Sequence, residues 1–250
     1  MTVAIATCSR RDIVATDGDD DVLIDAIGRI GIHAVPAIWD DDQVDWSRFD
    51  LVVIRTTWDY DERRDEFVDW AHRVEEVTTL CNPADVVRWN THKGYLMELE
   101  ERGVPVVPTA WLGAGDDVEL AALAASRRWD AVVVKPAVAA GSRGLTIVDT
   151  HPGDGQAALD ALLESHDVMV QPLLRRVATD GELSIVCLDG RYSHAIRKTP
   201  RAGDVRIQVE FGGTYVPETP TDDLVALAEW VVDSTGADLL YARVDLVPAD

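Results

Sequence analysis

Short apolar runs that alternate with amphipathic stretches dominate the first 80 residues of the chain. The runs VAIATC, HAVPAIW and LVVIRTTW have the length and the β-branched content of buried parallel strands. The stretches DDVLIDAIGRIG and RDEFVDWAHRVEE have the apolar spacing of amphipathic helices. This order predicts a Rossmann-like βαβ lobe. Because TCSRRD follows the first strand where a dinucleotide site would have GxGxxG, we do not expect such a site in this lobe.

The rest of the chain also mixes strands and helices. We expect a helix with Asn90 as its N-cap that runs through Leu99 and ends at Gly103, and then a strand over VPVVPTAWL. Asp189 and Gly190 predict the turn of a β-hairpin. The further elements expected are a helix over 116–129, strands over 131–136 and 145–149, a helix over 155–165, a strand over 167–174, a helix over 222–236 and a strand over 240–248.

The charge balance excludes several classes of partner. The 45 acidic and 23 basic residues give a formal net charge of -22, so the surface should repel nucleic acid and anionic membranes. No apolar stretch is long enough for a membrane span, and no secretion signal opens the chain, so we expect a cytoplasmic protein. The cysteines Cys8, Cys81 and Cys187 are far apart and predict buried free thiols.

Lysine is the unusual residue of this composition, because only Lys93, Lys135 and Lys198 are lysines among the 23 basic residues. Lys135 ends an apolar strand and is followed by the small residues of VVVKPAVAAGSRG. A lysine is a compact point charge, and a glycine-containing loop offers unobstructed N–H groups, so the pair suits a phosphate chain. An ordinary surface hairpin with a lysine is the open alternative, and GxxxxGK[ST] is absent.

Six segments in order carry a family resemblance. WNTHKGYLMELEERGVPVVPT, VVVKPAVAAGSRG, VMVQPLL, GELSIVCLDGRYSHAIRK, IQVEFGG and YARVDLV together resemble the ATP-grasp superfamily, which includes glutathione synthetase and D-alanine:D-alanine ligase. The resemblance implies an α/β ATP-grasp fold preceded by a Rossmann-like lobe. The domains expected are residues 1–84 as the N-terminal substrate lobe, 85–170 as the central lobe and 171–250 as the C-terminal lobe.

The resemblance also implies ATP and Mg²⁺ as cofactors, and it implies roles for individual residues. Lys93 and Lys135 correspond to phosphate-contacting lysines, and residues 139–144 to a mobile loop over the phosphates that we expect to be ordered by nucleotide. Glu182 would meet the ribose hydroxyls, and Asp245 would be a magnesium ligand. The other residues implied are Gly141, Ser142, Arg143 and Gly144 of the loop, Gln171, Pro172, Leu173 and Leu174 at the adenine edge, and Arg197, Arg206 and Arg243 as catalytic cations.

The N-terminal lobe should supply substrate specificity. RTTWDYDERRDEF follows the carboxyl end of a strand, where open α/β sheets bind ligands. The substrate-contacting residues expected there are Arg55, Thr57, Trp58 and Tyr60, with packing of Trp58 and Tyr60 on the core as the alternative. With NPADVVRWN, this stretch resembles the subgroup that contains the cyclo-ligase closing O-ureido-serine to cycloserine.

The function implied is therefore that of an ATP-dependent carbon-nitrogen ligase. It would activate a small amino-acid-like carboxylate as an acyl phosphate, and cyclisation of O-ureido-D-serine to D-cycloserine, an antibiotic, is one form of that reaction. A small-molecule kinase and a non-catalytic nucleotide-binding protein are the alternatives. The substrate, its stereochemistry and a homo-oligomeric state stay open. Because only five residues follow Asp245, we also expect further magnesium ligands to lie in a continuation beyond Asp250.

Overall fold

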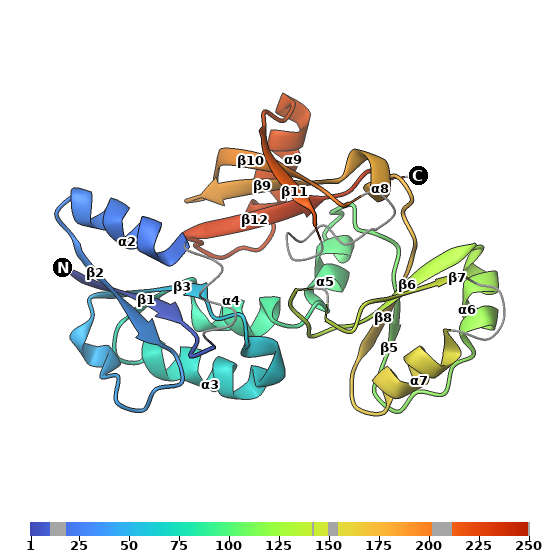
Figure 1. Cartoon of the computed structure of the whole chain (residues 1–250), viewed down its shortest axis with the longest axis horizontal. Helices are drawn as coiled ribbons and strands as arrows, with labels where there is room; N and C mark the ends of the chain where they lie inside the picture. Colours follow the sequence, from blue (N-terminus) through green and yellow to red (C-terminus); the bar gives the residue numbers. More distant parts are fainter. Residues whose placement is uncertain (11–18, 142, 150–154, 202–211, 250) are drawn as a thin grey trace. The chain divides into compact units, whose positions relative to one another are not determined.

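The computed structural model describes residues 1–10, 19–141, 143–149, 155–201 and 212–249 (Figure 1). It divides into two compact units. The first unit is Met1–His92 with Ala237–Leu240, and the second is Lys93–Gly236 with Tyr241–Asp250. Within the described residues, the strands form three four-stranded sheets.

A parallel sheet forms the centre of the first unit, with the strand order β2-β1-β3-β4. The central strand β1 is buried along its length, as its apolar run predicts. The predicted βαβ pattern is confirmed here. The elements are β1 (Thr2–Thr7), α2 (Asp19–Arg29), β2 (His33–Ile38), η1 (Trp46–Arg48), β3 (Leu51–Thr56), η2 (Tyr60–Glu62), α3 (Arg64–Glu75), β4 (Thr79–Cys81) and α4 (Ala84–Asn90).

Aromatic side chains close the core of this unit. Trp39 meets Phe67 edge-on with ring centroids 5.2 Å apart, and Phe67 stacks on Trp70 at the same distance. These rings, together with the alanines and valines of the sheet, make one apolar cluster. The end of β2 and the helix α3 are thereby fixed to each other.

An antiparallel sheet begins the second unit, with the order β5-β8-β6-β7. Val132 and Val134 of β6 and Val168 and Val170 of β8 are fully buried in one cluster with Leu159 of α7. The β-branched runs thus form the strands they predict. The elements are α5 (Tyr95–Glu101), β5 (Ala110–Leu112), α6 (Leu120–Arg127), β6 (Ala131–Pro136), β7 (Thr146–Asp149), α7 (Gln156–Leu163) and β8 (Val168–Pro172).

A second antiparallel sheet completes this unit, with the order β11-β10-β9-β12. Asp189 and Gly190 both have positive φ, 50° and 71°, so the predicted hairpin turn between β9 and β10 is confirmed. The helix α9 packs against β9, β10 and β12. The elements are α8 (Val177–Asp180), β9 (Glu182–Leu188), β10 (Arg191–Thr199), β11 (Thr214–Glu218), α9 (Asp222–Asp233) and β12 (Tyr241–Leu246).

Two predicted boundaries were wrong. Asn90 is the last residue of α4 and not an N-cap, because the helix already begins after Pro83 and a separate helix, α5, starts at Tyr95. The strand expected over VPVVPTAWL is confined to Ala110–Leu112. Pro105 and Pro108 have no N–H to donate to a ladder, which explains why the earlier part is irregular.

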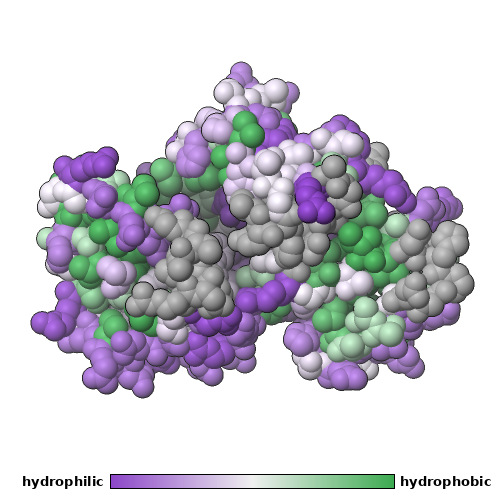
Figure 2. Space-filling view, in the orientation of Figure 1, coloured by the Kyte–Doolittle hydropathy of each residue, from purple (hydrophilic) through white to green (hydrophobic). Residues whose placement is uncertain are grey.

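Apolar surface remains around α2. Val22 and Ile30 are 70% and 73% exposed, and green hydrophobic surface is visible in Figure 2 where α2 and β2 lie. A shallow groove of about 530 Å³ runs here between α2 and β2, lined by Ile24, Ile32 and His33 among others. It lies at the amino-terminal end of β2, away from the carboxyl strand ends. In the described parts of the chain, no helix is long and apolar enough to cross a bilayer.

Candidate nucleotide and substrate sites

Strand alternation gathers five polar side chains on one face of the sheet β11-β10-β9-β12. Directly opposed residues of antiparallel strands share a face, and Lys198 pairs with Glu182 while Asp245 pairs with Ser184. Arg243 lies two residues before Asp245 on the same strand and therefore on the same face. We call Glu182, Ser184, Lys198, Arg243 and Asp245 the charged face.

The charged face is a connected network. Lys198 Nζ is 3.0 Å from Glu182 Oε1 and 3.6 Å from Asp245 Oδ1. Ser184 Oγ donates to Asp245, and Arg243 donates from Nε and Nη2 to the two oxygens of that carboxylate at 2.8 and 2.9 Å. Lys198 and Ser184 are buried. Two carboxylates are thus held together by two cations.

The network shifts the pKa values of its two carboxyl groups in opposite directions. Burial and the nearby charge of Asp245 raise the pKa of Glu182, although Lys198 acts in the opposite direction. Burial also acts to raise the pKa of Asp245, but Arg243, Lys198 and Ser184 together hold it below its usual range. Asp245 is therefore the stable anion of the pair, and Glu182 is the group whose charge depends on what binds nearby.

Lys135 brings a third cation toward this face from the other sheet of the same unit. It lies in β6 beside the buried Val134, and burial lowers the pKa of its ammonium, while the charge of Glu182 partly restores it. The main chain of Lys135 is paired within the β6–β8 ladder, but among the described residues its ammonium has no hydrogen bond or ion pair within 4.0 Å. A half-buried lysine without a close anion is costly, and a phosphate would relieve that cost.

A glycine sets the position of Glu182. Gly181 has a φ of 70°, and a Cβ at this residue would overlap the carbonyl oxygen of Lys198. Only glycine allows this approach of the two chains without strain. The start of β9 and the end of β10 can therefore lie close enough for the Lys198–Glu182 contact.

Lys93 is tied to the segment that follows β6. Its main-chain N–H donates to Ala137 O at 2.9 Å, and its Nζ donates to Ala139 O at 2.8 Å. Lys93 and Lys135 thus both lie at the entry to the predicted phosphate loop. In that loop Gly141 and Gly144 have positive φ, and Arg143 N–H donates to Ala140 O at 3.1 Å. The predicted site residues Ser142 and Arg206 lie outside the described residues.

The segment 171–174, predicted to meet adenine, ends β8. Gln171 is buried and donates from Nε2 to Thr109 Oγ1 at 2.8 Å, so its side chain is already used within the protein. The N–H of Leu173 donates to Ala131 O, and the carbonyl of Leu174 accepts from Val177 N–H. Pro172 has no N–H. These bonds fix the segment, and they withdraw the Leu173 donor from any adenine contact.

Arg197 does not lie on the charged face. Arg197 is paired with Leu183 of β9, whose side chain packs in the core on the opposite side of the sheet. The Arg197 guanidinium donates from Nε to Glu218 Oε2 at 2.7 Å. The sequence prediction placed Arg197 beside the phosphates; the structure puts it on the face opposite to Lys198, and its catalytic role stays a prediction. Strand alternation in β10 does not distinguish the two, because the apolar Ile196 shares the face of Lys198 and the side of Arg197 follows only from its register opposite Leu183.

The fit to the implied groups differs between nucleotide and metal. The Lys135 ammonium, which has no close anion, suits a phosphate group. Glu182, whose pKa is raised, suits a ligand that carries hydroxyl groups. For magnesium, the charged face offers the carboxylates Glu182 and Asp245, both already compensated by cations. Across the described residues, no group of three or more potential metal ligands comes together. Such a metal would need phosphate oxygens as its main ligands.

In the first unit, the predicted substrate residues follow β3 but differ in their surroundings. Arg55 Nη2 is 3.8 Å from Asp19 Oδ2, Thr57 is buried, and Trp58 is 40% exposed. Tyr60 packs against the apolar core, with its ring centroid 5.7 Å from that of Phe67. Tyr60 packs as the core alternative expects, whereas a substrate contact of the more exposed Trp58 stays a prediction.

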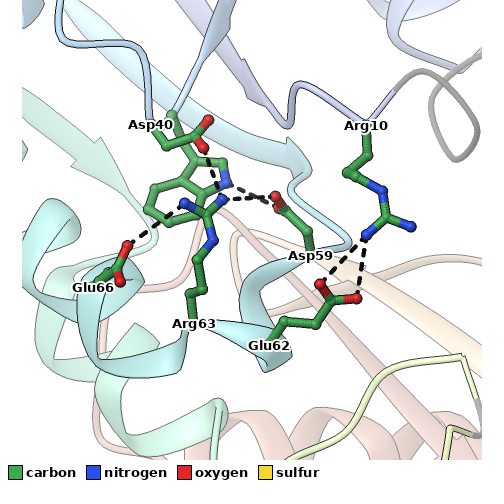
Figure 3. Close-up of polar contacts among 7 residues, drawn as sticks. Arg10, Asp40, Asp59, Glu62, Arg63 and Glu66 are labelled. Atoms are coloured by element: carbon green, nitrogen blue, oxygen red, sulfur yellow. Dashed lines mark hydrogen bonds and ion pairs between the residues drawn. The ribbon is translucent and has the colours of Figure 1, made fainter.

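An ion-pair cluster around the buried Asp59 fixes the turn that carries these residues (Figure 3). Asp59 is 2% exposed and accepts from Trp39 Nε1 at 2.9 Å and from Arg63 Nη2 at 3.0 Å. Arg63 also meets Asp40 at 2.7 Å, and its guanidinium lies 4.6 Å from the centroid of the Trp39 ring. The hydrogen bonds that Arg63 donates to Asp40 and Asp59 raise its pKa, although burial opposes them. The ends of β2 and β3 are thus joined.

Two family models match the chain in sequence order. The N-terminal domain of D-cycloserine synthetase DcsG matches residues 3–82, and the ATP-grasp domain of prokaryotic glutathione synthetase matches residues 108–248. The cycloserine biosynthesis protein DcsG of Streptomyces lavendulae is 38% identical over 188 residues, which cover 73% of this chain and 62% of that protein. A glutathione synthetase of Prochlorococcus marinus is 31% identical over 179 residues, covering 68% and 54%. The chain spans less than two thirds of each of these two relatives.

Solved structures agree with this order. The crystal structure of D-cycloserine synthetase DcsG aligns with a TM-score of 0.86 and 30% identity, covering 100% of this chain and 87% of that one. A D-alanine–D-alanine ligase from Bacillus anthracis complexed with ATP aligns with a TM-score of 0.75 and covers 100% and 82%, and at 14% identity it shows the fold alone.

Proposed function

This chain belongs to the ATP-grasp family, and from that premise we propose that it is an ATP-dependent carbon-nitrogen ligase that activates a small amino-acid-like carboxylate. The match to the N-terminal domain of DcsG supports O-ureido-D-serine as the substrate and D-cycloserine as the product. The observation that carries the proposal is Lys135, a half-buried lysine of lowered pKa without a close anion, whose charge interacts with that of Glu182 on the charged face.

The reaction has three covalent steps. A carboxylate oxygen attacks the γ-phosphorus of ATP, ADP leaves, and an acyl phosphate forms. The nitrogen next to the ureido oxygen then attacks the carboxyl carbon, and phosphate leaves with the electron pair of the broken C–O bond. That attack closes the five-membered ring as the nitrogen loses its proton, and one water molecule then hydrolyses the carbamoyl group, which leaves as carbon dioxide and ammonia. Phosphate is needed because oxide is a poor leaving group.

The residues of the chain act in this reaction by charge and position. Lys135 and Lys198 would hold phosphoryl oxygens, because ammonium groups in a partly dry site stabilise spread negative charge. Arg243 would keep Asp245 ionised and oriented, and Glu182 would accept from a ribose hydroxyl. Magnesium bound with the nucleotide would neutralise phosphate charge beside Asp245 and Glu182. Lys93, through Ala139, would hold the start of the phosphate loop in place.

The test is ADP formation with a panel of carboxylates. The full chain is incubated with ATP and magnesium, and ADP is measured with O-ureido-D-serine, its L-enantiomer, D-alanine and glycine, each with and without an added amine. The proposal predicts ADP formation with O-ureido-D-serine that needs no added amine. ADP formation only with a second amine would replace cyclisation by intermolecular ligation. A stable phosphorylated product would indicate a kinase, and nucleotide binding without ADP formation would indicate a binding protein.

A further inference from the structure

Two threonine hydroxyls join the carboxyl ends of β1 and β3 to the first turn of α2. Thr7 Oγ1 and Thr56 Oγ1 are 2.6 Å apart, and Thr56 Oγ1 donates to Asp20 Oδ2. A hydroxyl has one proton, so Thr56 spends its own on Asp20 and accepts the proton of Thr7. The hydrogen bonds therefore run in one direction, from Thr7 through Thr56, and end on the carboxylate of Asp20.

The second oxygen of that carboxylate is unused. Asp20 is only 9% exposed, and its Oδ1 is buried and accepts no hydrogen bond in the part of the chain that the structure describes. A buried acceptor without a donor costs about 1–3 kcal/mol, and more for a charged group. The amino-terminal end of α2 favours a negative charge here, but it gives Oδ1 no donor. A ligand with an N–H group would remove the cost.

A bulge in β3 lies at the same strand ends, and its extra residue carries a second unused polar atom. Ala6 of β1 pairs with Ile54 of β3 and Thr7 pairs with Thr56, so Arg55 is the bulged residue and has no partner on β1 in this register. Bulges redirect side chains and are frequent next to active sites. Arg55 approaches Asp19 at 3.8 Å through Nη2, while its Nε is buried and, among the described residues, has no hydrogen-bond partner. A carboxylate and a guanidinium, each with an unused atom, thus flank Thr56.

The sheet order places these groups where a ligand is expected. In the order β2-β1-β3-β4, the chain leaves β1 toward one edge and later returns to β3 on its other side. The carboxyl ends of β1 and β3 therefore form the point at which the strand order reverses. Ligands of open α/β sheets bind outside the strand ends at such a point.

We propose that Asp20 Oδ1 accepts a hydrogen bond from a cationic nitrogen of the substrate, the protonated α-amino group of an amino-acid-like carboxylate. This inference rests on the proposed function for the identity of the substrate. An ammonium group supplies both the missing hydrogen bond and a positive charge for the buried carboxylate, whereas a neutral amide supplies only the hydrogen bond. Arg55 then faces an oxygen of the same molecule. Asp20 is thereby a determinant of specificity for amino acids over their desamino analogues.

The experiment measures binding without ATP, by calorimetric titration of the full chain. The ligands are O-ureido-D-serine and the same molecule with hydrogen in place of the α-amino group. The variants are Asp20→Asn, which keeps the shape of the side chain, and Asp21→Asn as a matched control, since Asp21 is the next residue of α2 and is exposed. Thermal unfolding of each variant is recorded to check that the fold is kept.

Asp20→Asn should weaken binding of the amino compound by about 10- to 100-fold, the effect of one charge-assisted hydrogen bond. Binding of the desamino analogue should be unchanged, and Asp21→Asn should change neither. Equal affinities in the two variants, an equal loss for both ligands, or no preference of the unsubstituted chain for the amino compound would overturn the proposal. If the binding preference for the amino compound depended on Asp20 but no ADP formed, the amino-group site would stand and the ligase function would be wrong. If Asp20→Asn formed ADP with the KM of the unsubstituted chain, the ligase function would stand and the amino-group site at Asp20 would be wrong.

Discussion

Lys198 and Glu182 face each other across β10 and β9, with Nζ 3.0 Å from Oε1, while the neighbouring Arg197 lies on the other face of the sheet. The side chain of Lys198 is 7% exposed and that of Glu182 is 16% exposed. Removing the lysine leaves Glu182 and Asp245 as two partly buried carboxylates that lack their shared cation. The loss of one partner from a buried pair is strongly destabilising.

Lys198→Met should therefore lower the free energy of unfolding by about 3 kcal/mol at neutral pH. Arg197→Met is the matched control, because its ion pair with Glu218 is more exposed and should be worth about 0.5–1 kcal/mol. Urea unfolding measures both. The difference between the variants should shrink as the pH falls through the raised pKa of Glu182, since protonation removes one of the unpaired charges. Equal losses in the two variants would contradict the assignment of faces.

Lys135→Met should weaken ATP binding at least about 10-fold, the effect of one charge-assisted contact. Arg29→Met, a cation on the last turn of α2 in the first unit, should leave the affinity unchanged. Because the pKa of Lys135 is lowered, ATP affinity should also fall as the pH rises through that pKa, before an ordinary lysine would lose its proton. Titration with a fluorescent ATP analogue measures both effects. A pH profile that is the same in Lys135→Met would show that another group is responsible.

Without nucleotide, Lys135 should make stability rise with pH. Its folded pKa lies below the unfolded value of 10.5, so between the two the unfolded chain binds more protons than the folded one. In that window the free energy of unfolding increases with pH, and below it the full cost of burying the charge is present. The difference in stability between the unsubstituted chain and Lys135→Met, measured by urea unfolding across this window, should therefore change with pH. A flat difference would mean that the lysine is not desolvated.

Asp59→Ala should destabilise the first unit by about 2–4 kcal/mol, because it leaves Trp39 Nε1 and part of the Arg63 guanidinium without their buried acceptor. Glu62→Ala, three residues away, removes an exposed ion pair with Arg10 and should cost less than about 0.5 kcal/mol. Thermal or urea unfolding followed by tryptophan fluorescence distinguishes them, since Trp39 lies in the cluster. A similar loss in both variants would show that the cluster in Figure 3 does not fix this turn.

The order of elements and the family could be read from the sequence, because apolar periodicity and the six ordered motifs are local signals. The hairpin turn at Asp189 and Gly190 follows from the need for positive φ at both residues. The choice between Arg197 and Lys198 depends on the register of β10 against β9, which adjacent residues do not reveal. The unused oxygen of Asp20 could not be predicted at all, since it depends on contacts between residues 36 positions apart and on a bulge in β3.

The most direct test of the central claim follows oxygen from the substrate carboxylate. O-ureido-D-serine labelled with ¹⁸O in both carboxyl oxygens is incubated with the full chain, ATP and magnesium, and the released phosphate is analysed by mass spectrometry. An acyl phosphate carries one carboxyl oxygen as its bridge, and that oxygen leaves with phosphorus when nitrogen attacks the carbonyl carbon. The account predicts one ¹⁸O atom in each phosphate released. Phosphate without the label, or a label that stays wholly in an organic product, would contradict it.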